Sequence, residues 1–334
     1  MLKSFWRWVF LVVIAIICAV GYSGVRQIQV WLYEPIPIDE PKIIYIKPGS
    51  GLGRVSQQLH QDGIISHADS FKYLAKWRQL DRFIKAGEYQ FSGLLSAEEV
   101  LTQLVDGKIL EYSLTVPEGY TYSEFTKLLA EHPGMQGKPL PKISEWLDEV
   151  NSRFDHPEGL LFPSTYRFAR HNQPVDVIKQ AYKKQIQMLQ KAWINRAQNL
   201  PYTSPYEALI MASIIEKETA KASERETIAG VFVRRLQRGM KLQTDPTVIY
   251  GMGAAFDGNI RRSDLKRDTP YNTYVHKGLP PTPIALPGEA SIFAALNPAD
   301  GTSLFFVSKG DGSHAFSDTY EIHLENVRKY QLNQ

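Results

Sequence analysis

An uncharged apolar run near the N-terminus is the feature that most constrains how this chain folds. Residues 8–25 lie between Arg7 and Arg26 and contain no charged side chain. As a helix rising ~1.5 Å per residue, the run reaches about 27 Å, enough for the hydrocarbon core of a bilayer if flanking side chains reach the headgroups. We therefore expect a single transmembrane helix at 8–25. It is part of a segment, 1–30, that also contains a short N-terminal tip outside the membrane.

The charges around this run predict its orientation. Lys3 and Arg7 precede it, whereas three acidic residues follow it between positions 34 and 40. Because positive charges tend to stay on the cytoplasmic side, the N-terminus is expected in the cytoplasm and the body across the membrane. A cleaved signal peptide is the alternative, although the run is long for one and shows no clear A-x-A cleavage site. A lipoprotein signal at Cys18 is disfavoured because the bulky Ile17 precedes it.

Composition narrows the functional classes open to the rest of the chain. With 334 residues, 43% hydrophobic and 22% charged, it has room for two folded domains besides the apolar segment. The net charge of +3 comes without a dense Lys/Arg stripe, which argues against nucleic acid as a partner. The only cysteine, Cys18, lies in the apolar run, so the body suits an oxidising compartment. No metal-ligand spacing and no nucleotide-binding motif is present, so we expect neither a metal nor a cofactor.

Residues 31–110 divide into a linker and a small module. The proline- and acid-rich residues 31–42 predict an extended linker. Residues 43–110 follow the order β-α-α-β, with a further helix at 96–108. The βααβ part resembles a LysM-like module, a fold that elsewhere binds glycan chains. A plain adaptor domain is the alternative, since the resemblance is one of element order.

Local signals support this module. Ser96 and Glu99 form a capping-box pattern at the start of its last helix, and Gly107 marks the end of that helix. An earlier helix is expected at 70–79. On that helix, three large side chains are expected on one apolar face: Phe71, Leu74 and Trp77.

The remaining residues, 111–334, are expected to form a larger mixed α/β domain. Helical patterns cover 175–200, 205–220 and 223–239, and a loop-rich region with many Pro, Gly and Tyr residues follows at 240–316. A long irregular stretch inside a compact domain is more often functional than idle. The chain is therefore predicted to be an α+β protein with a loop-rich groove.

Residues 211–220, MASIIEKETA, raise the central chemical question. At about 100° per residue, Glu218 falls about 40° from Ile214, within the large aliphatic stripe, and Glu216 falls about 200° away. A carboxyl group on a core-facing stripe loses solvation, which raises its pKa and keeps it protonated near neutral pH. This geometry favours Glu218 as a general acid and Glu216 as its support. The alternative is a helix end that emerges into solvent with Glu218 as an ordinary surface charge.

Polar and aromatic residues downstream suit a groove for a sugar polymer, which offers C–H faces to aromatic rings and hydroxyls to fixed polar groups. They occur in the segments LQTDPTVIYG (242–251), YNTY (271–274) and HAFS (314–317). The alternative for each segment is a rigid structural loop, and a lone histidine such as His314 is more often structural. The candidates are Thr244, Asp245, Tyr250, Tyr271, Asn272, Tyr274 and His314.

Four motifs in a fixed order carry a closer resemblance: EGLLFPSTY, ASIIEKE, LQTDPTVIYG and YNTY…GLPPTPIALPG. Together, behind an N-terminal anchor, they resemble the endolytic murein transglycosylase family, also called MltG or YceG-like, over almost the whole chain. The resemblance implies an inner-membrane enzyme facing the periplasm, which cuts the β-1,4 bond between N-acetylmuramic acid and N-acetylglucosamine within peptidoglycan strands and leaves 1,6-anhydro ends. The family's catalytic glutamate maps to Glu218. Glycan-polymerising synthases are candidate partners for such a strand-terminating enzyme.

The expected mechanism gives Glu218 both proton transfers, first as acid and then as base for the muramic C6 hydroxyl. Glu216, Asp245, Tyr271, Asn272 and Tyr274 are candidates for positioning and charge stabilisation, and Thr244, Tyr250 and His314 for lining the groove. Three alternatives stay open: a water-using hydrolase with Asp245 as second carboxylate, a non-enzymatic glycan-binding scaffold, and a cofactor-dependent lyase. The membrane segment and the lack of a cofactor motif disfavour the last.

Overall fold

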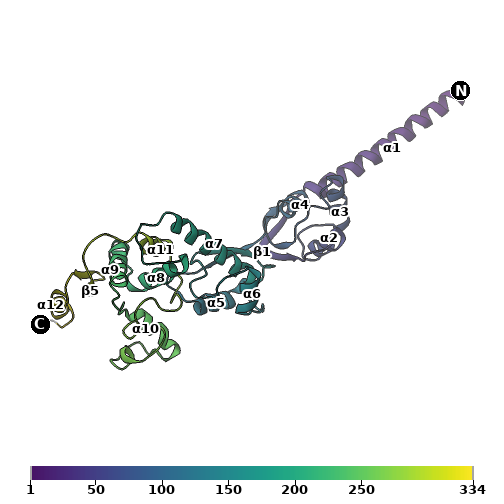
Figure 1. The fold of residues 1–334 in the computed structure, drawn as a ribbon. Helices are drawn as coiled ribbons and strands as arrows, with labels where there is room; N and C mark the ends of the chain where they lie inside the picture. Colours follow the sequence, from purple (N-terminus) through teal and green to yellow (C-terminus); the bar gives the residue numbers. More distant parts are fainter. Residues whose placement is uncertain (1, 333–334) are drawn as a thin grey trace. The chain divides into compact units, whose positions relative to one another are not determined.

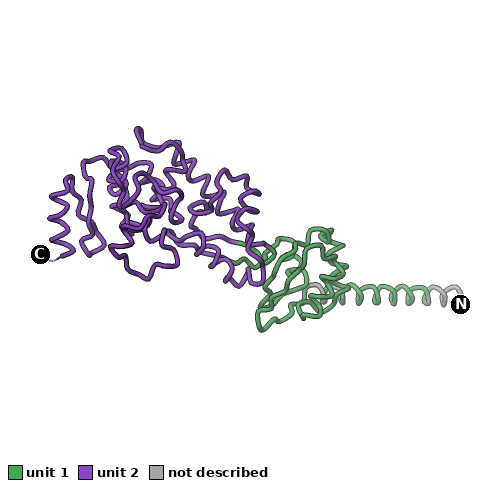
Figure 2. Tube along the Cα trace, turned by 60° about the horizontal axis from the view of Figure 1, so that its bottom comes forward, with its two compact units in different colours: residues 1–112, 168–171 green, residues 113–167, 172–334 purple. Residues whose placement is uncertain are grey.

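The computed structural model describes residues 2–332. Two compact units comprise residues 1–112 with 168–171 and residues 113–167 with 172–334, coloured green and purple in Figure 2. Within the described residues, the fold is mixed α/β: helices accompany three two-stranded sheets, β1–β2, β3–β4 and β5–β6.

The first unit begins with the long helix α1, Leu2–Tyr33 (Figure 1). Its window Phe10–Gln27 is long and apolar enough to cross a membrane, and none of that window is buried in the protein. This window overlaps the predicted span 8–25. Residue 1 and the side chains of Lys3 and Arg7, on which the predicted orientation depends, lie outside what the structure describes.

The rest of the first unit follows the expected order β-α-α-β-α. Its central hairpin is antiparallel: Ile36 pairs with Leu95 and Ile46 with Gly87, with a register shift between Ile38 and Lys42. Helices pack on this hairpin around a core that includes Leu59, Phe71 and Tyr89. The elements are β1 (Ile36–Ile46), α2 (Leu52–Gln61), α3 (Ala68–Trp77), β2 (Gly87–Leu95) and α4 (Ala97–Asp106).

Two local predictions in this unit have opposite outcomes. The capping box is confirmed, because the Ser96 hydroxyl accepts from the Glu99 backbone N–H, the Glu99 carboxylate accepts from the Ser96 backbone N–H, and Gly107 ends α4 with a left-handed backbone (φ 73°). The prediction that Trp77 shares the apolar face is wrong. Phe71 is fully buried, but the Trp77 side chain is 69% exposed, because position 77 lies about 240° around the helix from position 71.

The second unit contains the remaining helices and the β5–β6 hairpin, in which Phe305 pairs with Ser317 and Ser308 with His314. Short 3₁₀ turns at 133–135, 222–224, 253–255 and 264–266 connect some of its helices. Strands β3 and β4 pair with each other, and residues 111–112 and 168–169 of these strands belong to the first unit. In chain order the elements are β3 (Glu111–Thr115), α5 (Tyr122–Glu131), α6 (Ile143–Glu149), β4 (Thr165–Ala169), α7 (Pro174–Ile194), α8 (Pro205–Glu218), α9 (Arg225–Gln237), α10 (Asp245–Met252), α11 (Glu289–Leu296), β5 (Phe305–Ser308), β6 (His314–Ser317) and α12 (Tyr320–Gln331).

Helix α8 is the centre of the second unit. It contacts α7, α9, α10 and α11, and every residue from Ala208 to Ile215 is buried. Ser204 caps its first turn and Pro205 begins it, as expected for a helix start. Within the helix, the buried Ser213 hydroxyl accepts from the backbone N–H of Ile284 at 2.9 Å, which fixes the proline-rich loop to α8. The last turn of α8 is therefore held on a rigid support.

Candidate active site

Glu218 is the last residue of α8, where the chain turns extended at Thr219. The hydroxyl of Thr244 donates a hydrogen bond to its carboxyl oxygen Oε1. Burial raises the pKa of Glu218 to about 7, the Thr244 hydrogen bond opposes that rise, and the negative charge of Asp245 adds to it. The predicted direction of this pKa shift is confirmed, so a large fraction of the group stays protonated near neutral pH.

The physical reason differs from the one that the helical face suggested. Because α8 is buried all round, the aliphatic stripe does not distinguish Glu218 from Glu216, whose side chain is only 6% exposed. What separates the two is their surroundings. Glu216 is held by a cation and a backbone N–H, whereas Glu218 has a hydroxyl partner and a neighbouring acid.

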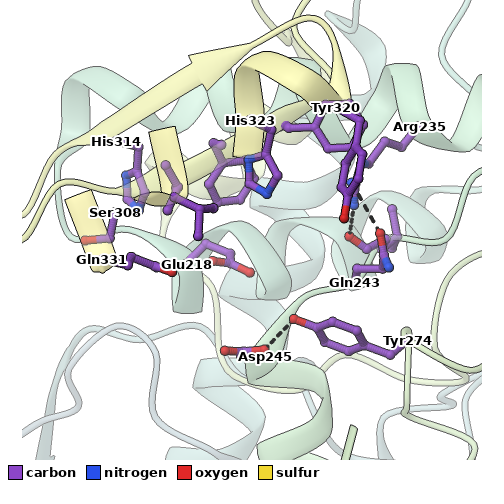
Figure 3. A pocket seen from close by; sticks show the side chains of 15 residues that line it. Glu218, Arg235, Gln243, Asp245, Tyr274, Ser308, His314, Tyr320, His323 and Gln331 are labelled. Carbon is purple, nitrogen blue, oxygen red and sulfur yellow. Dashed lines mark hydrogen bonds between the residues drawn. The ribbon is translucent and has the colours of Figure 1, made fainter. Parts of the chain in front are cut away.

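A cavity of about 510 Å³ opens in front of Glu218 (Figure 3). Four of the candidate residues line it: Glu218, Asp245, Tyr274 and His314. A fifth, Thr244, contacts this lining through its hydrogen bond to Glu218. One wall comes from β5 and α12 at the C-terminal end of the chain. The other lining residues are Arg235, Leu242, Gln243, Phe305, Phe306, Val307, Ser308, Tyr320, His323, Val327 and Gln331.

The start of α10 brings Thr244 and Asp245 to this cavity. Thr244 is buried, and its backbone N–H donates to the Thr273 hydroxyl at 3.1 Å, which ties the start of α10 to the loop after it. Asp245 is exposed, and its Oδ1 accepts from the Tyr274 hydroxyl at 2.6 Å, a contact drawn in Figure 3. A second carboxylate with a tyrosine partner thus faces the same cavity as Glu218.

His314 forms a pair with Glu224 on another side of the cavity. Its Nδ1 lies 2.7 Å from Glu224 Oε2, and both side chains are nearly buried. Burial raises the pKa of Glu224, but hydrogen bonds from the His314 side chain and backbone outweigh it and hold the pKa below its usual value. If Nδ1 donates a hydrogen bond to Glu224, the other ring nitrogen, Nε2, is available to bond a molecule in the cavity.

Three candidates lie away from the cavity. The Tyr250 hydroxyl donates to Glu158 at 3.0 Å, and the Tyr250 ring packs edge-on against Tyr271 at 4.9 Å. Tyr271 shares a 2.8 Å hydrogen bond with the Thr282 hydroxyl of the proline-rich loop. Asn272 is buried, with its amide donating to three backbone carbonyls of residues 264–267. Their hydrogen bonds hold together loops that do not line the cavity.

Glu216 also lies outside the cavity lining. Its Oε2 accepts from the Gly288 backbone N–H at 2.9 Å, and its Oε1 is 3.7 Å from the guanidinium of Arg225. Glu118 approaches the same guanidinium at 4.0 Å. Burial and the nearby Glu216 raise the pKa of Glu118, which Arg225 partly offsets. Glu216 therefore ties the end of α8 to the start of α11.

Sequence reasoning missed Arg235 and Glu158. Arg235 is buried at the cavity wall, where its guanidinium donates to the carbonyls of Leu304 at 2.7 Å and Leu242 at 2.6 Å. Glu158 is 3% exposed, and burial raises its pKa to about 7. The arginine pattern on α9 is typical of a surface helix. One sequence signal could have drawn attention to Glu158: it is the first residue of the motif EGLLFPSTY.

Within residues 2–332, no group of three or more His, Cys, Asp or Glu side chains is arranged to hold a metal ion. The groups that can transfer protons at the cavity are carboxyl, hydroxyl and imidazole groups. An acid with a pKa near 7 can donate a proton to a leaving oxygen and then accept one from a nucleophile in the same cycle.

Comparisons with known proteins show which family the chain is similar to. The profile of the family described as YceG-like matches residues 44–329. A Bacillus subtilis protein named endolytic murein transglycosylase is 31% identical over 319 residues, covering 90% of this chain and 88% of that protein. A Streptococcus pneumoniae protein of the same name is 28% identical over 360 residues, covering 96% of this chain and 64% of that protein. A solved Listeria monocytogenes structure, described as yceG-like, aligns with a TM-score of 0.54 at 30% identity, covering 86% of this chain and 100% of its own.

Proposed function

The chain belongs to the YceG-like family, and from this membership we propose that it is a membrane-anchored lytic transglycosylase acting on peptidoglycan. It would cut the β-1,4 bond between N-acetylmuramic acid and N-acetylglucosamine within a glycan strand. The observation that carries this proposal is Glu218: a partly buried acid with a pKa of about 7 on the wall of a polar cavity. With this pKa, a large fraction of the group is protonated at neutral pH, and a protonated acid is what a leaving glycosidic oxygen requires.

In the proposed reaction, the Glu218 carboxyl group protonates the glycosidic oxygen as the bond from that oxygen to muramic C1 breaks. The resulting carboxylate then takes the proton from the muramic C6 hydroxyl, whose oxygen attacks C1 of the same sugar. The products are a strand with a 1,6-anhydro end and a strand with a free N-acetylglucosamine hydroxyl. Because the nucleophile is intramolecular, proximity supplies much of the rate, and no second catalytic carboxylate is needed.

The neighbours of Glu218 have distinct roles in this proposal. Thr244 stabilises the carboxylate that forms after the first proton transfer, since its hydroxyl donates to that group. Asp245, oriented by Tyr274, is available to offset positive charge at muramic C1. His314 is positioned by Glu224 to hydrogen-bond the glycan. Glu216, Tyr250, Tyr271 and Asn272 support the loops around them.

The test is product analysis of glycan strands digested with the full-length chain in detergent, with wild type beside Glu218→Gln. We expect anhydro-muramic ends from wild type and none from the variant, while both melt at a similar temperature. Anhydro ends from Glu218→Gln at the normal rate would refute the assignment of Glu218. Retained strand binding without cleavage by wild type would instead support a glycan-binding scaffold.

A water-using hydrolase is the second candidate, because Asp245 lines the same cavity as Glu218. In that case Asp245 would activate water, and the strands would carry reducing ends. Asp245→Asn separates the two mechanisms. A hydrolase loses nearly all activity with this change, whereas a transglycosylase keeps its anhydro product at a reduced rate.

We also propose a cellular arrangement. Helix α1 would anchor the chain in the inner membrane as a single pass, with a cytoplasmic N-terminus and a periplasmic body, as its apolar window suggests. Residues 1–30 would form the tip and anchor, 43–110 the LysM-like module and 111–334 the catalytic domain. Of the linker expected at 31–42, residues 31–33 belong to α1 and 36–42 to β1, so the connection itself is short. Cleavage of nascent strands there would terminate their elongation, next to glycan-polymerising synthases.

A further inference from the structure

The first unit exposes three large apolar side chains, two on α3 and one near the end of β2. Tyr73 is 76% exposed and Trp77, one turn later, is 69% exposed, so the two share a face of the helix. Leu94, near the end of β2, is 67% exposed. Leu94 lies on the opposite face of the hairpin from its neighbour Leu95, which packs against the core. Large exposed apolar side chains that share a helix face, as Tyr73 and Trp77 do, are candidates for an interaction site.

Hydrogen bonds and ion pairs place this end of α3 near the end of α1. Strand β1 begins at Ile36, shortly after α1 ends, and Ile36 pairs with Leu95, the neighbour of Leu94. Helix α4 follows at once, and its Glu98 forms an ion pair with Arg78, the residue after Trp77. Helix α1 itself contacts both α3 and α4, as Figure 1 shows.

The length of α1 beyond its apolar window indicates how far the first unit lies from the hydrocarbon core of the bilayer. The apolar window ends at Gln27 and the helix ends at Tyr33, six residues later. At ~1.5 Å per residue, these six residues span about 9 Å, close to the thickness of one headgroup layer, about 5–8 Å. The α1 end of the first unit therefore starts at the level of the lipid headgroups, if α1 crosses the bilayer.

We propose that Tyr73, Trp77 and Leu94, flanked by Lys76 and Arg78, dock the first unit onto the phospholipid headgroups of the bilayer that α1 spans. Tryptophan and tyrosine favour this layer, because the ring is apolar and its N–H or O–H stays hydrated. Lys76 is exposed and can meet lipid phosphates, and the Arg78 guanidinium, paired with Glu98, lies 5.2 Å from the Trp77 ring centre. The inference rests on the proposed anchoring role of α1.

The chain offers the probes for a direct test. A spin label on the only native cysteine, Cys18, reports whether α1 lies in the bilayer. In a Cys18→Ser background, Lys76→Cys places a label beside Trp77. Lys47→Cys places a control label after Ile46, at the far end of the hairpin, where Ile46 pairs with Gly87. Gly87 is eight positions before Leu95 on β2, so the two ends of the strand lie about 26 Å apart. The full-length chain is reconstituted in phosphatidylethanolamine–phosphatidylglycerol vesicles, and collisions with oxygen and with a water-soluble nickel complex are measured by electron paramagnetic resonance.

We expect the Cys18 label to lie in the hydrocarbon and the Lys76 label to be several-fold less accessible to the nickel complex than the Lys47 label. If Cys18 is in the bilayer but Lys76 and Lys47 are equally accessible, docking is refuted and anchoring stands. If Cys18 is in water, both proposals fall. If the Lys76 label becomes immobile only when glycan strands are added, the surface binds glycan, and the lipid proposal is overturned.

A substitution series separates docking by these side chains from mere proximity to α1. Tyr73→Ser, Trp77→Ser and Leu94→Ser combined should return the Lys76 label to the accessibility of Lys47, with Cys18 unchanged. The matched control is Phe83→Ser, which removes another aromatic side chain with 61% exposure, four residues before Gly87 and the far end of the hairpin. An unchanged Lys76 label in the triple variant would overturn the proposal.

Discussion

Two regions of the second unit each hold a carboxyl group whose pKa is raised to the same value. Glu218 and Glu158 both have a pKa of about 7, and burial is the largest cause in each case. Glu218 accepts a hydrogen bond from the Thr244 hydroxyl and lines a cavity of about 510 Å³. Glu158 accepts from the Tyr122 backbone N–H at 2.9 Å and from the Tyr250 hydroxyl at 3.0 Å.

The difference between these regions lies in access rather than acidity. Glu158 is 3% exposed, and its two oxygens are occupied by groups that join α5 to α10. Glu218, by contrast, lines the cavity, with its Oε1 bonded to the Thr244 hydroxyl. A perturbed pKa thus identifies a buried acid, and an adjoining cavity identifies one that can meet a substrate.

The largest expected effect is the loss of catalysis on removing the accessible acid. Glu218→Gln should lower the rate of glycan cleavage by about 10²–10⁴-fold, the usual contribution of a general acid. Glu158→Gln is the matched control, an equal chemical change at an enclosed site, and should keep most of the rate. The measurement is the initial rate of soluble fragment release. Equal losses in both variants would mean that access does not separate the two acids.

The next effect concerns the hydrogen bond that is specific to Glu218. Cleavage by wild type should fall as the pH rises through about 7, because Glu218 then loses the proton it donates. The Thr244 hydroxyl lowers the Glu218 pKa, so Thr244→Val should move this alkaline limb to higher pH by up to about one unit. Thr126→Val, which removes a hydroxyl bonded only to the backbone of α5, is the control. A limb that moves to lower pH would contradict the role of Thr244.

How much the sequence predicts depends on the distance over which a feature is determined. The apolar N-terminal helix and the Ser96 cap follow from adjacent residues, and the structure contains both. Strand β1 was expected at 43–46, but it continues back to Ile36 through a segment with two prolines. Its early residues pair with Gly93–Leu95, and no local pattern records that partner.

The site follows the same rule. The direction of the Glu218 pKa shift was predictable from an apolar helix that ends in acids. The partners were not, because the Glu158–Tyr250 and Glu224–His314 contacts join residues 92 and 90 positions apart. Hydroxyl and carboxyl groups in loops look alike in sequence whether they face a cavity or another loop. Tertiary packing decides between the two, and it leaves Tyr250 and Tyr271 outside the cavity lining.

A third prediction concerns stability rather than rate. The folded chain holds the Glu158 proton up to a pH of about 7, whereas the unfolded chain releases it near its ordinary pKa of 4.5. The folded state therefore binds more protons between these values, and the stability from this group is present below pH 4.5 and lost as the pH rises through 7. The loss is roughly 3 kcal/mol. Glu158→Gln should remove this part of the pH dependence, as measured by urea unfolding at pH 5 and pH 8. An unchanged slope would show that Glu158 is ionised in the folded protein.

The smallest expected effect comes from the tyrosine that encloses Glu158. Tyr250→Phe removes the hydroxyl that donates to Glu158 Oε2, and that bond is stronger when the carboxyl group is charged. The variant should therefore lose more stability at pH 8 than at pH 5, by about 1 kcal/mol. Tyr166→Phe is the matched control, because its buried hydroxyl donates to the Phe162 carbonyl and its loss should not depend on pH. The same pH dependence in both variants would mean that the Tyr250 hydroxyl does not stabilise the charged form of Glu158. Another group would then have to stabilise that charge in the folded protein.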